Sequence, residues 1–321
     1  MPYTSVNSFV QLGIEGTSGT LSSNLKTIPV SSPQVTPMQT FLRDEAFRGS
    51  PAKVYSQVAG VRHDEYDAKF YVFPDTFPLL AYSILGVDTV TGTTPKVHTV
   101  KLKNDATTGS QPPSVSIIDF DGQQAFQMLD AQATDLKLNF GAEAAVEATT
   151  KFIAQPWSEV STPGSLSIGS NTFVPGWDCA LSIGGTSSAV LVDGEVNITR
   201  SAEAIFTAGQ QNPYKTWAGP IDVTGRLKFV VESTDPLLLA ANGSIALTQN
   251  TKAVVLTFTE PVTTYTTAIT MSQVQFHDAK RTRDKAYVEV DASFTAQANT
   301  TDAVSGYSPI KIVSQNTVTS Y

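Results

Sequence analysis

Apolar and polar residues alternate along much of this chain, and few folds tolerate such a pattern. Successive side chains of a strand point to opposite faces, so the alternation predicts strands with one buried and one polar face. Val, Thr, Phe and Tyr are frequent in these segments, and clusters of Gly, Pro and Asn separate them. We predict a mostly β (α+β) fold with antiparallel strands. The clearest strand segments are Tyr66–Phe73, Thr134–Phe140, Val146–Ile153, Leu227–Val231, Ala253–Thr259 and Tyr287–Ala296.

Only two segments carry clear helix signals. The first, Asp75–Gly86, begins with residues that can cap a helix, has a proline in its first turn and ends at a glycine. The second, Ser233–Gly243, carries the same three signals. Two helices built alike prompt a search for a repeat.

Three pairs of segments match in the same order along the chain. Any single match could be two generic β segments, but three in order favour a tandem duplication. We predict two β-sandwich or partial-barrel modules, each with one flanking helix. A join rich in Ser, Thr, Pro and Gly, 158–169, suits a boundary. The matches are Tyr66–Gly86 with Val223–Gly243, 43–60 with 200–219, and Val146–Gln155 with Val288–Gln297.

The predicted boundaries are 1–157 for the first module with an N-terminal arm, 158–297 for the second module, and 298–321 for a C-terminal arm. A sheet module of this kind exposes strand edges, which promote association. A ring of neighbouring copies would satisfy every edge in the same way.

The composition argues against a protein that grips nucleic acid. The 321 residues include 21 Lys and Arg against 29 Asp and Glu, a formal net charge of -8. Such a balance is unsuited to binding phosphates. Since neither a long apolar run nor a leader-like N-terminus is present, we expect no membrane association and synthesis in the cytoplasm. The single cysteine, Cys179, fits a reducing compartment.

No metal, cofactor or nucleophile motif stands out. His63, His98 and His277 lack the spacing of a metal site, and Cys179 has no evident base beside it. The chain has neither a phosphate-binding Gly-rich loop with lysine nor a Gly-x-Ser-x-Gly motif. We therefore predict no enzyme, no catalytic residues, no cofactor and no metal.

Two groups of carboxylates leave a glycosidase open as an alternative. Asp119 with Asp121, or Asp64 with Glu65 and Asp67, could supply an acid and a base or nucleophile. Acidic residues beside strand turns are, however, common. The basic run 280–285 is interrupted by acid, which favours a solvated hairpin tip or a contact with an acidic neighbouring subunit.

In the order of its landmarks, the chain resembles the tail tube (major tail) proteins of long-tailed bacteriophages, the siphoviruses. The resemblance covers nearly the whole chain in the order of its elements. The landmarks are Phe9–Thr20, Pro29–Ser32, Arg43–Arg48, the strand and helix at 66–86, the strand pair Ala133–Gln155, the strand Trp177–Gly185 and the strand pair Ala268–Phe294.

The resemblance implies a virion structural protein of the tail, made in the bacterial host cytoplasm. In that family, inner strands of neighbouring subunits form a barrel around a lumen, and stacked rings form the tube that conducts DNA. An acidic wall fits this role, since it would repel phosphate. Two modules per chain imply a homotrimeric ring with pseudo-sixfold symmetry, with a homohexamer as the alternative.

The implied partners are further copies of the chain, a tape measure protein, and tail terminator and distal tail proteins at the tube ends. Phage DNA would pass through the lumen without specific binding.

The long loop of this family reaches toward the next ring, which assigns that role here to the polar stretches 43–58 and 200–217. The alternative is that these are solvated loop residues. The terminal arms, 1–27 and 298–321, could also tie subunits together. The predicted inter-ring contacts are Asp44, Glu45, Arg48, Lys53, Arg200, Glu203 and Lys215.

A competing class remains: a β-sandwich carbohydrate-binding or adhesin module. It predicts a saturable glycan site and no self-assembly.

Overall fold

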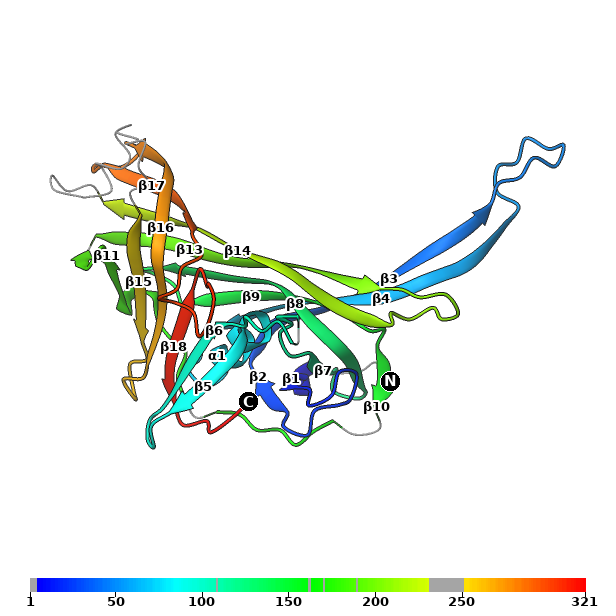
Figure 1. Cartoon of the computed structure of the whole chain (residues 1–321), viewed down its shortest axis with the longest axis horizontal. Helices are drawn as coiled ribbons and strands as arrows, with labels where there is room; N and C mark the ends of the chain where they lie inside the picture. The colour runs from blue at the N-terminus through cyan, green and yellow to red at the C-terminus, as the bar shows by residue number, and fades with distance from the viewer. Residues whose placement is uncertain (1–4, 108, 161–162, 170, 189, 231–250) are drawn as a thin grey trace.

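The computed structural model describes residues 5–107, 109–160, 163–169, 171–188, 190–230 and 251–321 (Figure 1). Nearly all regular structure in these residues is strand, as the alternation predicts. The elements are η1 Ser5–Asn7, β1 Phe9–Ile14, β2 Lys26–Ile28, β3 Val30–Asp44, β4 Ser56–Tyr71, α1 Phe77–Leu85, β5 Gly86–Thr91, β6 Lys96–Leu102, β7 Val115–Phe120, β8 Ala125–Gly141, β9 Glu147–Ala154, β10 Ser158–Val160, η2 Gly176–Asp178, β11 Cys179–Ile183, β12 Thr186–Ser188, β13 Leu191–Ile205, β14 Lys215–Val230, β15 Lys252–Thr259, β16 Thr266–Thr282, β17 Glu289–Ala296 and β18 Lys311–Asn316.

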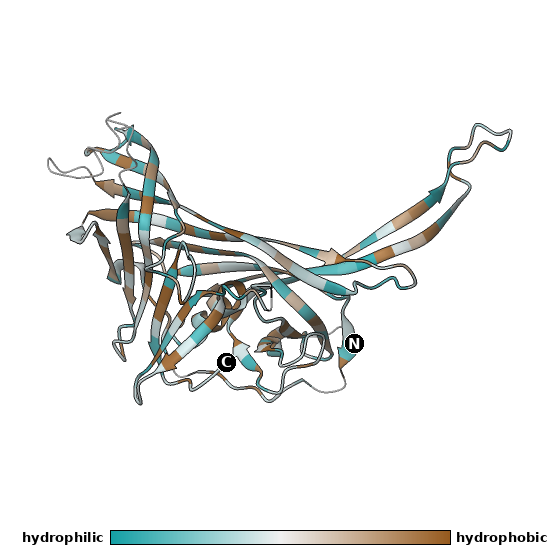
Figure 2. Ribbon diagram, viewed as in Figure 1, coloured by the Kyte–Doolittle hydropathy of each residue, from teal (hydrophilic) through white to brown (hydrophobic). Residues whose placement is uncertain are grey.

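The strand predictions are confirmed, because each of the six segments lies mainly in a strand, namely β4, β8, β9, β14, β15 or β17. Hydrophilic and hydrophobic residues alternate along the long strands (Figure 2). In β17, for example, Val290, Ala292 and Phe294 are buried, whereas Asp291 and Ser293 are only half-buried. The pleat thus directs one face of each strand into the core.

The first predicted helix is confirmed as α1. Pro78 lies in its first turn, and Gly86 ends it with a left-handed φ of 95° while donating its N–H to the Tyr82 carbonyl. A side chain there would be strained, which explains the glycine. Leu80 and Ile84 are fully buried, and the helix packs against β8 and β6. The second predicted helix, 233–243, lies outside the described residues.

One long sheet has the strand order β3-β4-β9-β8-β13-β14-β17-β16, all antiparallel. The first parts of β8 and β16 bend away to pair with other strands, which form the opposite side of the core. Helix α1 lies between these layers (Figure 1). The β3–β4 hairpin projects well beyond the rest of the subunit (Figure 1).

The two halves of the chain pair their strands in the same pattern. The order β3-β4-β9-β8 corresponds to β13-β14-β17-β16, and β2-β1-β7-β8-β10 corresponds to β12-β11-β15-β16-β18. Bulges recur as well. The shift between Gln39 and Phe41 corresponds to that between Arg200 and Ala202, and the bulge at Thr134 corresponds to that at His277.

The ladders correct the register of two sequence matches. Phe152 and Phe294 are equivalent, and they lie opposite Tyr66 and Gly225 respectively. The sequence match placed Tyr66 on Val223, two residues away, because it assumed equal spacing from strand to closing glycine in both halves. Likewise Gln39, not Arg43, is the ladder equivalent of Arg200.

Both expected arms contribute strands to the subunit itself. In the N-terminal segment, β1 pairs with β2 and β7. In the C-terminal segment, β18 pairs with β16 of the second half and β6 of the first. The join near 158–169 contributes β10, which pairs with β8.

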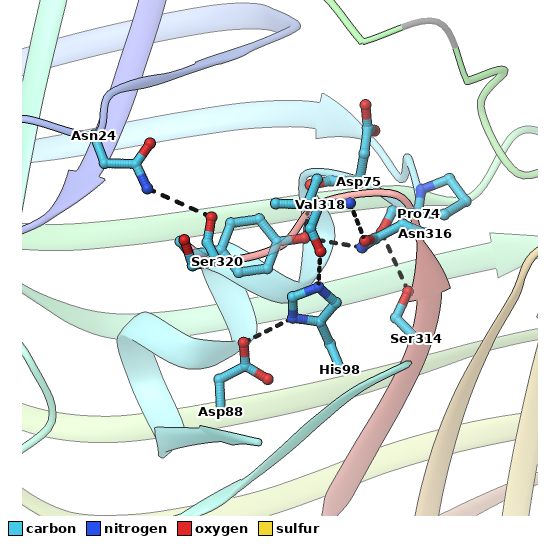
Figure 3. Close-up of polar contacts among 10 residues, drawn as sticks. Asn24, Pro74, Asp75, Asp88, His98, Ser314, Asn316, Val318 and Ser320 are labelled. Atoms are coloured by element: carbon cyan, nitrogen blue, oxygen red, sulfur yellow. Dashed lines mark hydrogen bonds and ion pairs between the residues drawn. The ribbon is translucent and has the colours of Figure 1, made fainter. Parts of the chain in front are cut away.

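The last residues of the chain are anchored beside the start of α1 (Figure 3). The side-chain amide of Asn316 donates to the Pro74 carbonyl at 2.8 Å, and the Tyr321 hydroxyl donates to the Asp75 carbonyl at 2.7 Å. The C-terminal end is therefore held by hydrogen bonds within the subunit.

A buried histidine completes this anchor (Figure 3). His98 Nδ1 lies 2.7 Å from an Asp88 carboxylate oxygen, and Nε2 lies 2.9 Å from the Val318 carbonyl. Burial disfavours the imidazolium, but the hydrogen bonds and the Asp88 charge outweigh it, and the pKa of His98 is raised. The protonated ring can donate to both partners.

Candidate assembly surfaces

One face of the long sheet is polar along its whole width. On β13, Val196 and Ile198 are buried against the core, whereas Glu195 and Asn197 on the opposite face are half-exposed. Acids outnumber bases on this face. By the same alternation its charged residues include Glu65, Asp67, Lys69, Asp135, Lys137, Glu147, Lys151, Asp193, Glu195, Asp222, Arg226, Lys228, Lys280, Glu289 and Asp291.

Five bases on this polar face are paired with acids of adjacent strands, namely Lys69, Lys137, Lys151, Arg226 and Lys228. Lys137 Nζ lies 3.0 Å from Glu195, across the contact between β8 and β13. Arg226 bridges Asp193 at 3.1 Å and Asp291 at 2.7 Å. The pairing neutralises the bases locally, so the excess charge presented by the face is acidic.

One ion pair recurs at equivalent positions of the two halves. Lys69 Nζ lies 2.7 Å from Glu147, and Lys228 Nζ lies 3.0 Å from Glu289. The equivalence follows from the ladders, since Phe70 is opposite Ala148 and Phe229 is opposite Val290.

The structure brings together the four predicted contact residues of the first polar stretch. Strands continue to Asp44 and resume at Ser56, so only 45–55 is a loop. Arg48 forms an ion pair with Asp44, and Lys53 lies 3.6 Å from Glu45. All are at the projecting tip of β3–β4, and these exposed pairs add little stability.

The second polar stretch is half strand, with a loop at 206–214. Glu203 is exposed, and the Lys215 ammonium lies 5.7 Å from the centre of the Trp217 ring. This loop touches β4 of its own chain, because the Arg62 N–H donates to the Gln211 carbonyl at 3.0 Å.

Arg200 does not fit an inter-ring role. It is only 4% exposed and donates to the carbonyls of Ile84, Ser110 and Gly219 at 2.7, 3.0 and 3.0 Å. Burial lowers the pKa of Arg200 to about 10, so the side chain stays charged at neutral pH. Because the Arg200 guanidinium is buried and its donors are bonded within the subunit, it is not available to contact another ring. Its place in the alternation after Val196 and Ile198 already put it on the buried face.

The β3–β4 hairpin also carries a set of exposed apolar side chains that was not predicted from the sequence. Phe41, Leu42 and Val58 are 51%, 66% and 63% exposed. In the second hairpin, Ala202 is the equivalent of Phe41, and its ladder partner Ala218 is buried. The signal was Phe41 and Leu42 directly before the polar stretch 43–58, and Val58 at its end.

The carboxylates considered for a glycosidase have structural roles. Asp121 accepts the N–H groups of Gln123 and Gln124 at 2.8 and 2.7 Å and closes the β7–β8 turn. Burial, and then the Asp121 charge, raise the pKa of Asp119 to about 6. Asp64 accepts the Trp157 N–H at 2.7 Å.

Glu65 and Asp67 both lie on the polar face, and the Asp67 carboxylate is 3.8 Å from the Lys151 ammonium. None of these carboxylates lines the hollow of about 100 Å³ beside Phe140 and Trp177 or the hollow of about 480 Å³ beside Arg200.

Within the described residues, no group of three or more His, Cys, Asp and Glu could hold a metal ion. In the same part of the chain, no helix is both long and apolar enough to cross a membrane. Burial, and then Asp178, raise the pKa of the Cys179 thiol to about 12, which disfavours the reactive thiolate.

A family model described as phage tail tube protein matches residues 5–304, nearly the whole chain. The chain belongs to the phage tail tube protein family. The resemblance in the order of landmarks is thereby confirmed, and the membership points to a structural component of the phage tail, and so of the virion. A search of curated proteins found no match.

Proposed function

We propose that this protein forms the tail tube by closing rings of three chains, which stack around a lumen. The observation that carries the proposal is the long sheet of two like halves, joined by the pairing of β8 with β13. A tandem duplication explains why pairing order and bulges repeat in the two halves. Three chains then supply six similar units, the pseudo-sixfold ring.

The polar face of the long sheet would line the lumen. Five of its bases are engaged by acids of neighbouring strands, as in the pairs Lys137–Glu195 and Lys228–Glu289, and Lys280 lies at the edge of the sheet. A lysine or arginine free to meet phosphate would release counterions and hold the DNA. A wall with paired bases and excess acid lets duplex DNA pass without specific binding, which is a structural rather than an enzymatic role.

The hairpin tips would make the contacts between stacked rings. Asp44, Glu45, Arg48 and Lys53 gather at the β3–β4 tip, and Glu203 and Lys215 lie near the end of the β13–β14 hairpin. Arg200 is left out because it is buried. A tape measure protein inside the lumen, and tail terminator and distal tail proteins at the ends, complete the proposed assembly.

Charge changes at the first tip test the inter-ring role. Arg48→Glu should shorten or abolish tubes without unfolding the subunit, because it places like charges side by side. The exchange variant Asp44→Arg with Arg48→Asp restores the pair within the hairpin but reverses the charge at each position. Tubes lost in both variants support contacts between rings, whereas recovery in the exchange variant reduces the pair to a local one.

Negative-stain electron microscopy of the purified protein, with mass photometry, tests the main proposal. We expect tubes or rings of three chains. Rings of six chains would keep the tube and overturn the trimer. A stable monomer at high concentration, in the presence of a tail-tip complex as initiator, would overturn the proposed function and leave a monomeric binding module.

A further inference from the structure

The two ends of the long sheet are edges within the described residues. On one side β3 pairs only with β4, and on the other the last part of β16, from Gln275, pairs only with β17. Strand edges expose backbone donors and acceptors that can pair with another chain. Each edge can therefore accept a strand of another copy.

The chain contains its own template for such a join. In the middle of the sheet, β13 of the second half pairs with β8 of the first. Asn197 is opposite Lys137 and Glu195 is opposite Asn139. This internal seam brings together the first strand of one half and the fourth strand of the other.

The strand ladders show which residues at the two free edges are equivalent to the residues of the internal seam. The bulges fix the shift between β13 and β3, so that Asn197 corresponds to Thr36. The bulges of β8–β9 and β16–β17 fix the second shift, so that Lys137 corresponds to Lys280. Both strands run in the same sense as their equivalents, so the new pairing is antiparallel.

We propose that residues 32–38 of one copy pair with residues 278–284 of the next copy, with Thr36 opposite Lys280 and Gln34 opposite Thr282. This proposal rests on the proposed function, and it specifies the surface that closes the ring. Repeated three times, the join makes the sheet continuous.

The covered and uncovered hairpins support this join. The base of β13–β14 packs over the first half of its own chain: the Thr216 N–H donates to Asp130 at 2.8 Å and the Ala218 N–H to Gln111 at 2.9 Å. The equivalent β3–β4 hairpin is touched by the 206–214 loop of its own chain on β4, at Ala59 and Arg62, but Phe41, Leu42 and Val58 stay exposed. The same join would place it over the second half of the neighbouring copy and bury these side chains.

The chemistry of the two edges explains why free subunits need not aggregate. The internal seam places Val196 opposite Leu138 and Ile198 opposite Leu136 on the core side. The corresponding positions between copies are Val35 opposite Arg281 and Pro37 opposite Ala279. Prolines belong at sheet edges because they lack an N–H. The join between copies is thus more polar than the seam inside the chain.

Cysteine pairs test the register. In assembled tubes, the variant Thr36→Cys with Lys280→Cys should be linked between chains by a short bis-maleimide, giving covalent trimers on a denaturing gel. The pair Lys137→Cys with Asn197→Cys is the matched reference within one chain. Cys179 can stay, since burial raises its thiol pKa to about 12.

The control pair is Thr36→Cys with Asp284→Cys, four residues out of register and about 13 Å away along the strand. The pair Gln34→Cys with Thr282→Cys repeats the test one step along the ladder, in case the first variant does not fold. Efficient linking of either in-register pair, together with at least tenfold weaker linking of the control, supports the join.

Tubes in which the internal reference links, but no in-register pair does, overturn the join while keeping the tail tube function. Preferential linking of the control pair overturns the register. Absence of tubes and rings in the unmodified protein overturns the proposed function itself, and with it the ring-closing join.

Discussion

The two long hairpins share one backbone plan but lie in different surroundings. In β13–β14 the base is covered by the first half of the chain, and Arg200 is buried there on three carbonyl oxygens. In β3–β4 the equivalent residue, Gln39, is exposed, and so is Phe41 next to the bulge. The same backbone plan is therefore buried within the chain in one hairpin and exposed at the equivalent positions of the other.

The local geometry is nevertheless preserved in both hairpins. A Cβ on Gly219 would come within 2.5 Å of the Ser201 hydroxyl, and a Cβ on Gly60 would clash with Thr40 in the same way. Glycine is required at both positions because the bulged residue lies against it. What differs between the hairpins is therefore their cover and not their backbone.

Phe41→Asp should produce the largest change, the loss of tubes. The exposed ring contributes little to the free subunit, so the free energy of unfolding should change by no more than about 0.5 kcal/mol. Burying a carboxylate between copies would, in contrast, prevent assembly. Electron microscopy and denaturant unfolding measure the two effects. Phe41→Leu is the control and should assemble, whereas tubes in Phe41→Asp would show that this surface stays uncovered.

Arg200→Met should destabilise the subunit by about 3 kcal/mol, because several buried carbonyls lose their donors. The matched variant at the exposed equivalent, Gln39→Met, should change the free energy of unfolding by about 0.5 kcal/mol or less. The midpoints of denaturant unfolding test both. Similar losses for the two variants would remove the distinction between the covered and the open hairpin.

The anchor between the halves should weaken as pH rises. His98 has a raised pKa in the folded chain, so the stabilisation from its protonation is complete below the ordinary value of 6.5 and is lost as pH rises through the folded pKa. Unfolding midpoints across pH 5–9 measure it in wild type and in Asp88→Asn. The variant should show a smaller decline, and an equal decline would exclude this pair as its source.

The smallest expected difference concerns the repeated ion pair. The Lys69 side chain is 45% exposed, whereas that of Lys228 is 23% exposed and has a second acid, Asp193, at 3.9 Å. Lys69→Met should cost about 0.5 kcal/mol or less, and Lys228→Met should lower the unfolding midpoint further. Measurements at low and high salt check this, since the Lys69 effect should be the more strongly screened. Equal changes in the unfolding midpoint for Lys69→Met and Lys228→Met would contradict the expected difference between the two ion pairs.

The sequence predicted the elements that depend on local pattern. Alternation located β4, β8, β9, β15 and β17, and the proline and glycine signals located α1. The polar stretches 43–58 and 200–217 were expected to be loops, and 45–55 and 206–214 are loops, but the remaining residues of both stretches belong to the hairpin strands. Nearly all residues of 43–58 are exposed, so no buried face marks where its strands end.

Positions that depend on pairing between distant strands could not be predicted. The register of the two halves rests on bulges at residues such as Thr40 and Ser201, which have no compositional mark. Arg200 illustrates the same limit at the site: its charge suggested a surface contact, whereas carbonyls distant in sequence bury it. Asp44 and Arg48 were predicted together as contact residues. They lie at the same tip because they are close in sequence within one hairpin, so no distant strand had to be placed.

The pairing of β18 with β6 also affects when the molecule becomes complete during synthesis. Domains generally fold in order as the chain leaves the ribosome. Here β6 pairs with β18, which is made long after it, and Tyr321 bonds back beside α1. The edge of β6 therefore stays open until β18 has left the ribosome, and a chain cut before β18 lacks the strand that closes this edge.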